Sequence, residues 1–85
     1  MRKYLVMAMR TPRFDDSVLI PHKEWLAAVG ERGQLVETGK FTDGSGGAYV
    51  ITAESLSAAQ DLIHTDPIHI TGASELTVYE WEITG

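Results

Sequence analysis

One order of segments, strand–helix–strand, occurs twice within these 85 residues, and few folds accommodate it. The first copy opens with residues 3–9, an apolar run too short for an ordinary helix and typical of a strand covered on both faces. The pattern then predicts a helix with a cap among residues 15–17, with Pro21 in its opening turn, where a missing N–H costs least. Gly33 supplies the left-handed residue that ends this helix. Residues 34–42 alternate as a second strand.

The second copy starts across a glycine-rich turn. Residues 43–47 predict a hairpin turn, because their glycines tolerate the positive φ that such turns need. Residues 48–53 predict the third strand, and Ser55 predicts the cap of a second helix that runs to Asp66. Because proline disfavours the helical conformation of the residue before it, we expect Asp66 to end that helix in an extended turn. Residues 75–83 predict the fourth strand.

This order favours a four-stranded antiparallel sheet with two helices on one face. We therefore predict the α+β class and a ferredoxin-like βαββαβ arrangement, with residues 1–85 forming a single domain. Helices would cover only one face of the sheet, yet the first strand is apolar on both. Further bulk on the open face is expected from Tyr49, Ile51, Tyr79, Trp81 and Ile83. Water would then meet an apolar patch larger than monomers usually expose, so we expect a homodimer through this open sheet face.

Charge and composition exclude several classes of partner. Seven basic and twelve acidic residues give a net charge of −5, and no basic cluster offsets the repulsion of nucleic acid. No stretch approaches the ~20 apolar residues of a membrane span, and the apolar run at the N-terminus is too short for a signal peptide. We expect a cytoplasmic protein that binds neither nucleic acid nor membrane.

Strand direction brings residues that are distant in sequence to one end of the molecule. The end of the first strand, the start of the first helix, the end of the second helix and the hairpin between the middle strands share that end. The expected group contains Arg10, Arg13, His22, Asp43, Asp66 and His69.

His22 and Asp66 form the candidate catalytic pair. His22 lies on the stripe of the first helix that faces the sheet, and histidine suits proton transfer near neutral pH. An aspartate beside it would orient the ring and stabilise its charged form. The alternative is that His22 is a buried neutral histidine bonded to a backbone carbonyl, and that Asp66 only shapes a turn.

Four other residues have weaker assignments. Arg10 and Arg13 are candidates for binding a substrate carboxylate through a forked guanidinium, or are only loop charges. His69 is a candidate for binding an anion or for replacing either member of the pair. We expect His64 to lie on the surface.

The sequence gives no motif for a metal or a nucleotide. No HxH or HExxH spacing supports a metal site, so we expect none. Residues 43–47 lack the Lys-Ser/Thr ending of a phosphate loop and lead into a strand, and no Gly-x-Ser-x-Gly elbow supplies a nucleophile. We expect no cofactor.

A set of short motifs covers almost the whole chain in a specific order. It comprises Tyr4-Leu5-Val6-Met7, Pro21-His22, Glu31-Arg32-Gly33-Gln34-Leu35, Gly39, the glycine hairpin, Ser55, Asp66-Pro67, Gly72 and Val78-Tyr79-Glu80. In this order and spacing the chain resembles the YCII-related (YciI-like) family of the dimeric α/β-barrel superfamily. The resemblance implies a ferredoxin-like protomer, a sheet-to-sheet dimer, and a His–Asp pair, at His22 and Asp66, in a cavity between sheet and helices.

The resemblance also implies a range of chemistry. A related protein removes chloride from a chlorinated hydroxyquinone, and relatives in the superfamily isomerise or cyclise small rings. The chain departs from the family at Gly39-Lys40, where Gly-Pro is common, and at Ile68, where an aromatic residue often follows Asp-Pro.

These observations lead to one hypothesis and two alternatives. The first is a small cofactor-independent enzyme of lyase or isomerase type, in which His22 moves a proton, Asp66 orients it, and Arg10 or His69 holds an anionic group of a small organic molecule. The second is a binding or accessory module that holds a ligand without turnover. The third is a structural dimer with no ligand.

Overall fold

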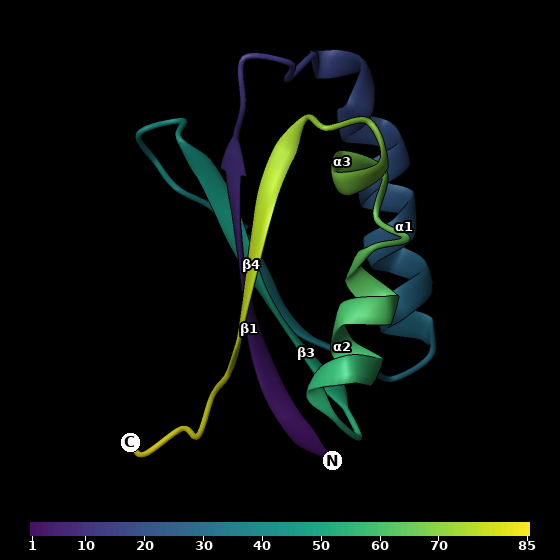
Figure 1. The fold of residues 1–85 in the computed structure, drawn as a ribbon, viewed down its shortest axis with the longest axis vertical. Helices are drawn as coiled ribbons and strands as arrows, with labels where there is room; N and C mark the ends of the chain where they lie inside the picture. The colour runs from purple at the N-terminus through teal and green to yellow at the C-terminus, as the bar shows by residue number, and fades with distance from the viewer.

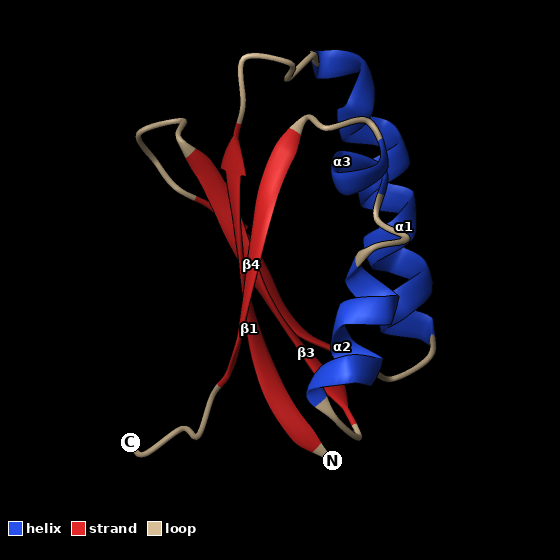
Figure 2. Cartoon of the chain, viewed as in Figure 1, coloured by secondary structure: helices blue, strands red, loops and turns tan.

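A four-stranded antiparallel sheet carries all the helices on one face in the computed structural model, which describes residues 1–85 (Figures 1 and 2). The strand order is β2-β3-β1-β4. The elements are β1 (Arg2–Arg10), a 3-10 helix η1 (Asp16–Val18), α1 (Leu19–Glu31), β2 (Leu35–Lys40), β3 (Gly46–Ala53), α2 (Leu56–Ile63), α3 (Pro67–Ile70) and β4 (Ser74–Glu80). The predicted α+β, ferredoxin-like arrangement is confirmed.

The helix boundaries follow the predicted signals. Asp15 accepts a hydrogen bond from the Ser17 amide at 3.0 Å and so caps η1, which continues into α1. Gly33 adopts φ +74° just beyond the end of α1, a conformation that glycine reaches without steric cost. Ser55 caps α2 by accepting from the Ala58 amide at 3.1 Å. Local capping chemistry therefore decides where these helices begin and end.

The turn of the β2–β3 hairpin lies two residues earlier in the chain than predicted. β2 ends at Lys40, and β3 begins at Gly46 rather than two residues later, so two of the predicted turn glycines lie within a strand. Gly46 pairs with Met9 of β1, and a Cβ at this position would collide with the carbonyl oxygen of Ala8. Glycine is required there because two backbones approach closely.

The Asp66-Pro67 step differs from the prediction in one respect. Asp66 has the extended backbone expected before proline, φ −66° and ψ 128°, but α2 has already ended at Ile63. Asp66 instead caps α3, accepting a hydrogen bond from the Ile68 amide at 3.1 Å. Proline suits the first turn of a helix, so the dipeptide starts α3 and does not end α2.

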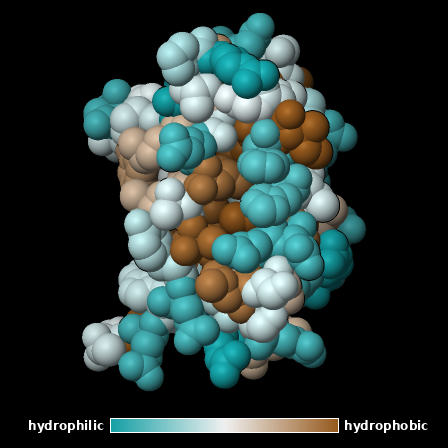
Figure 3. Space-filling view, viewed as in Figure 1, coloured by the Kyte–Doolittle hydropathy of each residue, from teal (hydrophilic) through white to brown (hydrophobic).

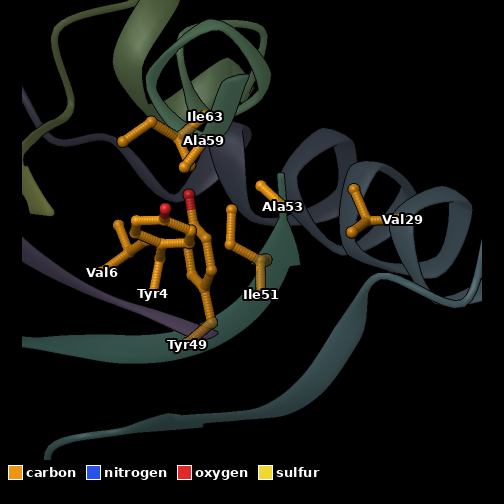
Figure 4. Packing of buried hydrophobic residues seen from close by; sticks show 8 residues of the cluster. All are labelled: Tyr4, Val6, Val29, Tyr49, Ile51, Ala53, Ala59 and Ile63. Atoms are coloured by element: carbon orange, nitrogen blue, oxygen red, sulfur yellow. The ribbon is translucent and has the colours of Figure 1, made fainter. Parts of the chain in front are cut away.

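The core lies between the sheet and the two longer helices. Tyr4 and Val6 of β1 and Tyr49 and Ile51 of β3 point toward the helices and contact apolar residues of α1 and α2 (Figure 4). The prediction that Tyr49 and Ile51 lie on the open face is wrong. Each is directly paired with a core residue, Val6 with Tyr49 and Tyr4 with Ile51, and side chains of directly paired residues share a face of the sheet.

The opposite face of the sheet carries no helix (Figure 1). By strand register it presents Leu5, Met7, Val50, Tyr79 and Trp81. Tyr79 and Trp81 are 55% and 43% exposed, which is high for large side chains with no local role. The exposed apolar face expected from the sequence is therefore present, and Tyr79 and Trp81 lie on it as expected, whereas Ile83 lies beyond the end of β4.

Apolar side chains also reach the surface on the side of β4. Figure 3 shows them gathered between the sheet and the helix layer, with hydrophilic side chains around them. Leu76 and Val78 of β4 are half-buried and pack against the core here. No helix of the chain is long and apolar enough to cross a membrane.

Candidate active site

His22 and Asp66 form a direct hydrogen bond between α1 and the start of α3. The His22 Nδ1 atom lies 2.8 Å from the Asp66 Oδ1 atom, although 44 residues separate them in sequence. A carboxylate only accepts hydrogen bonds, so this contact places the proton of the neutral ring on Nδ1. The Asp66 side chain is fully buried, and the His22 side chain is 18% exposed.

Two further groups hold the Asp66 carboxylate. The Ile68 amide donates to Oδ1 at 3.1 Å, and the Tyr49 hydroxyl donates to Oδ2 at 3.2 Å. Burial, and then the negative charge of Asp66, raise the pKa of Tyr49 far above its ordinary value. Tyr49 therefore stays a neutral donor, and the buried carboxylate has three hydrogen bonds that fix its position.

The second nitrogen of the His22 ring is left free. Nε2 makes no hydrogen bond within the chain. No buried side-chain nitrogen or oxygen lacks a hydrogen-bond partner, so Nε2 is not buried and solvent reaches it. The Trp25 ring stacks on His22 with centroids 6.4 Å apart and an interplanar angle of 14°. Trp25 is itself held by a hydrogen bond from its Nε1 to the Thr65 hydroxyl at 2.9 Å. The ring is therefore fixed on one edge and accessible on the other.

A small pocket lies against His22 between the sheet and α1. Its free volume is about 100 Å³. Phe14, Leu19 and Ile68 contribute apolar walls, and Arg10 and Lys40 contribute positive charge. The Arg10 guanidinium lies 4.0 Å above the Phe14 ring, a cation–π arrangement that holds this long side chain.

The other residues of the expected group separate. His69 is exposed and stacks on His64, with centroids 4.5 Å apart, and it does not line the pocket beside His22. Arg13 lies against Gly72. Asp43 stays within its own turn, where hydrogen bonds from Ser45 lower its pKa. The structure thus joins Arg10, His22 and Asp66 at one site and separates His69 from it.

Sequence reasoning missed three residues of this site. Tyr49 was expected on the open face because an apolar strand does not reveal which alternate set faces the helices. Lys40 lies at the end of an edge strand and has no motif of its own. Trp25 follows His22 by three residues and so shares its face of the helix, but nothing in the pattern indicates that its ring lies against His22.

The chain offers no obvious metal site. No group of three or more His, Cys, Asp or Glu side chains lies close enough together to hold a metal ion. The chemistry available at this site is therefore that of a histidine, a buried carboxylate, a neutral phenol and two cations.

Comparison with solved structures finds the same protomer fold in enzymes. One match is the 5-chloro-2-hydroxyhydroquinone dehydrochlorinase of Burkholderia phenoliruptrix AC1100, solved with 2,5-dihydroxybenzoquinone. It is 17% identical, with a TM-score of 0.71 over 94% of this chain and 93% of that one. Muconolactone isomerase is 14% identical, with a TM-score of 0.75 over 93% of this chain and 86% of that one. At these identities the likeness shows the fold alone.

Comparison of the sequence is more specific. The chain is 41% identical over 83 residues to the uncharacterized protein YjpA of Bacillus subtilis (strain 168), and the match covers 98% of each. The YCII-related domain matches residues 3–82. Since this match spans nearly the whole chain and agrees with the resemblance of its motifs, the chain belongs to the YCII-related domain family.

Proposed function

We propose that the chain is a small acid–base enzyme of lyase or isomerase type that acts on an organic molecule without a cofactor. The observation that carries the proposal is the 2.8 Å bond between His22 Nδ1 and the buried Asp66 carboxylate. It leaves the Nε2 edge of the ring accessible beside a pocket. A ring held at Nδ1 presents the Nε2 lone pair, which is the group that a general base uses.

Each neighbour of His22 then has a role. Asp66 fixes the tautomer of the ring and stabilises the imidazolium that forms when Nε2 takes a proton. Tyr49 and the Ile68 amide hold the carboxylate through its two oxygens. The raised pKa of Tyr49, caused first by burial and then by Asp66, keeps the phenol protonated, so it supports the aspartate rather than exchanging protons with substrate.

One proton-moving group beside the pocket supports a reaction that depends on moving a proton. Both an elimination and an isomerisation can be driven by moving a proton at a carbon next to a carbonyl group. The names of two proteins with the same fold, a dehydrochlorinase and an isomerase, describe reactions of these two kinds. They support lyase or isomerase chemistry here, and they provide the first substrates to test.

A second function is favoured by the size of the pocket. Its free volume of about 100 Å³ in the protomer is small compared with the several hundred Å³ that are usual for ligand sites. A non-catalytic module that binds a small ligand would need no more room than this. Turnover distinguishes the two functions.

We also propose that the protein works as a homodimer joined through the open sheet face. Tyr79 and Trp81 would be covered by the second copy, together with Leu5 and Val50 beneath them. A hollow of about 510 Å³ on this face, bordered by Leu5, Val50 and Trp81, would receive side chains of the partner. Burial of this surface would supplement the limited core of a small protomer.

The experiment that tests the enzyme is turnover of chlorinated hydroxyhydroquinones and small unsaturated lactones by wild type and His22→Asn. Asparagine can keep a hydrogen bond to Asp66 from its amide while removing the Nε2 base. Loss of a general base lowers kcat by about 10²–10⁴-fold. His64→Asn, on the outer surface, is the matched control and should retain full activity. Binding without turnover of any panel member would favour the accessory module.

A further inference from the structure

The charge around the pocket is opposite to that of the molecule. The chain carries twelve acidic and seven basic residues, yet no aspartate or glutamate lines the pocket beside His22. Two of the seven basic side chains, Arg10 and Lys40, lie there together with His22. A cleft that concentrates positive charge attracts anionic ligands and repels cationic ones.

Neither cation is neutralised by the protein itself. The ion pairs of the chain are Arg2 with Glu80 and His22 with Asp66, and no side-chain hydrogen bond engages Arg10 or Lys40. Asp66, the carboxylate bound to His22, is fully buried and already has three hydrogen-bond donors. The positive charge of Arg10 and Lys40 is therefore available to a ligand.

Arg10 and Lys40 line the same pocket from the ends of two different strands. Arg10 ends β1, and its guanidinium is held over the Phe14 ring at 4.0 Å. Lys40 ends the edge strand β2, and it borders both this pocket and the hollow on the open face. Apolar atoms of Phe14, Leu19 and Ile68 form part of the lining. A flat apolar body with one acidic group matches these features.

We propose that the pocket selects a small organic anion, a carboxylate or an acidic enol on an apolar ring, and that Lys40 acts with Arg10 as the specificity-determining pair. The inference rests on the proposed function, since the anion is the molecule on which His22 acts. Lys40 contributes a point charge and Arg10 a forked donor, so together they bind the two oxygens of a carboxylate or the single oxygen of an ionised enol. A neutral molecule of the same shape gains none of this energy.

The test compares two probes of matched shape, benzoate and benzamide, by amide NMR titration of the full chain at about pH 7, where benzoate is ionised. We expect benzoate to shift the resonances of His22, Lys40 and Gly47 and to bind at least about tenfold more tightly than benzamide. Lys40→Gln and Arg10→Gln should each weaken benzoate binding by about three- to tenfold, and Lys40→Arg should restore most of it. Lys23→Gln, which removes an exposed charge from α1, is the control and should change nothing.

Several outcomes would overturn the proposal: equal affinity for the two probes, unchanged benzoate affinity in Lys40→Gln, or no binding of either probe at millimolar concentration. Failure of the enzyme hypothesis has a different signature. Lys40-dependent benzoate binding without turnover of any panel member would support the anion site and favour the accessory module over the enzyme. Turnover of a panel substrate with the same KM in wild type and Lys40→Gln would keep the acid–base enzyme and refute the anion site.

Discussion

The imidazole of His22 and the carboxylate of Asp66 meet at 2.8 Å across the junction of α1 and α3, and the carboxylate is completely shielded from water. A buried charge persists only where hydrogen bonds compensate its lost hydration, and here the ring, a phenol and a backbone amide all donate. Function and stability are therefore coupled at Asp66.

Asp66→Ala should destabilise the protein far more than Asp66→Asn. Alanine leaves Tyr49 and the Ile68 amide without their acceptor and removes the cap of α3, at a cost of about 2–4 kcal/mol. Asparagine caps nearly as well as aspartate and still offers one oxygen, so we expect a loss of about 1 kcal/mol. Urea unfolding of the two variants measures this difference, and equal losses would refute the proposed network.

Asp66→Ala should change the tautomer of His22, whereas Asp66→Asn should keep it. Alanine removes the acceptor at Oδ1, so the proton of the neutral ring is no longer required on Nδ1. An asparagine that still caps α3 keeps an oxygen at Oδ1, which also accepts from the ring. The ¹⁵N shifts of the ring nitrogens should change from a single Nδ1-protonated form to a mixture in the alanine variant alone, with His64, outside the network, as the internal control. An unchanged His22 tautomer in Asp66→Ala would return Asp66 to the role of a residue that shapes the turn.

Tyr49 should make the protein sensitive to alkali. Burial, and then Asp66, raise its folded-state pKa above the ordinary value of about 10. Above about pH 10 the unfolded chain releases this proton and the folded chain does not, so stability is complete below that pH and falls as pH rises, by up to ~1.4 kcal/mol per unit.

Tyr49→Phe should remove the contribution of Tyr49 to the fall in the free energy of unfolding between about pH 10 and 11.5. Part of the slope should remain, because burial, and then Glu80, raise the pKa of Tyr4 as well. Urea unfolding of wild type and variant across this range provides the measurement. If the free energies of unfolding of wild type and variant changed equally with pH, the Tyr49 phenol would ionise equally well in the folded and unfolded states.

The fold was predictable because its signals are local. Ser55 and the Asp66-Pro67 step each determine where a helix begins, and Gly33 determines where one ends, through their own backbone or side-chain chemistry. The order of segments then leaves one compact arrangement, and that arrangement brings Asp66 near His22. The pair was therefore predictable from topology and the inward stripe of the first helix.

What was missed depends on contacts between distant segments. The face on which Tyr49 lies is decided by its pairing with Val6, and a register shift of one residue would reverse it. Gly46 belongs to a strand because it passes close to Ala8, which no local pattern reveals. Lys40 borders the pocket only because β2 ends there.

Gly46→Ala should weaken the pairing of β1 with β3. The added Cβ would collide with the Ala8 carbonyl oxygen and lie 3.0 Å from the Met9 Cα atom, and backbone atoms cannot move aside cheaply. We expect a loss of about 2–3 kcal/mol in the free energy of unfolding. Gly39→Ala is the matched control, because nothing lies within 4 Å of its added Cβ. Equal stability of the two variants would contradict the close approach.

The dimer is tested most sharply at Tyr79. Its side chain is 55% exposed in the protomer, so Tyr79→Asp leaves the core intact and should be tolerated by an isolated chain. In a dimer through the open sheet face, the same change buries a charge in an apolar interface. We expect wild type to sediment at twice the chain mass of 9.4 kDa at micromolar concentration, and Tyr79→Asp to sediment as a less stable monomer.

Ile70→Asp provides the control for this substitution. Ile70 is 67% exposed, but it lies on α3, away from the open sheet face. The same charge placed there should leave both the assembly and the stability close to wild type, since surface changes usually stay within about 0.5 kcal/mol. A well-folded wild-type monomer at micromolar concentration, or dissociation by Ile70→Asp but not by Tyr79→Asp, would refute association through the open face.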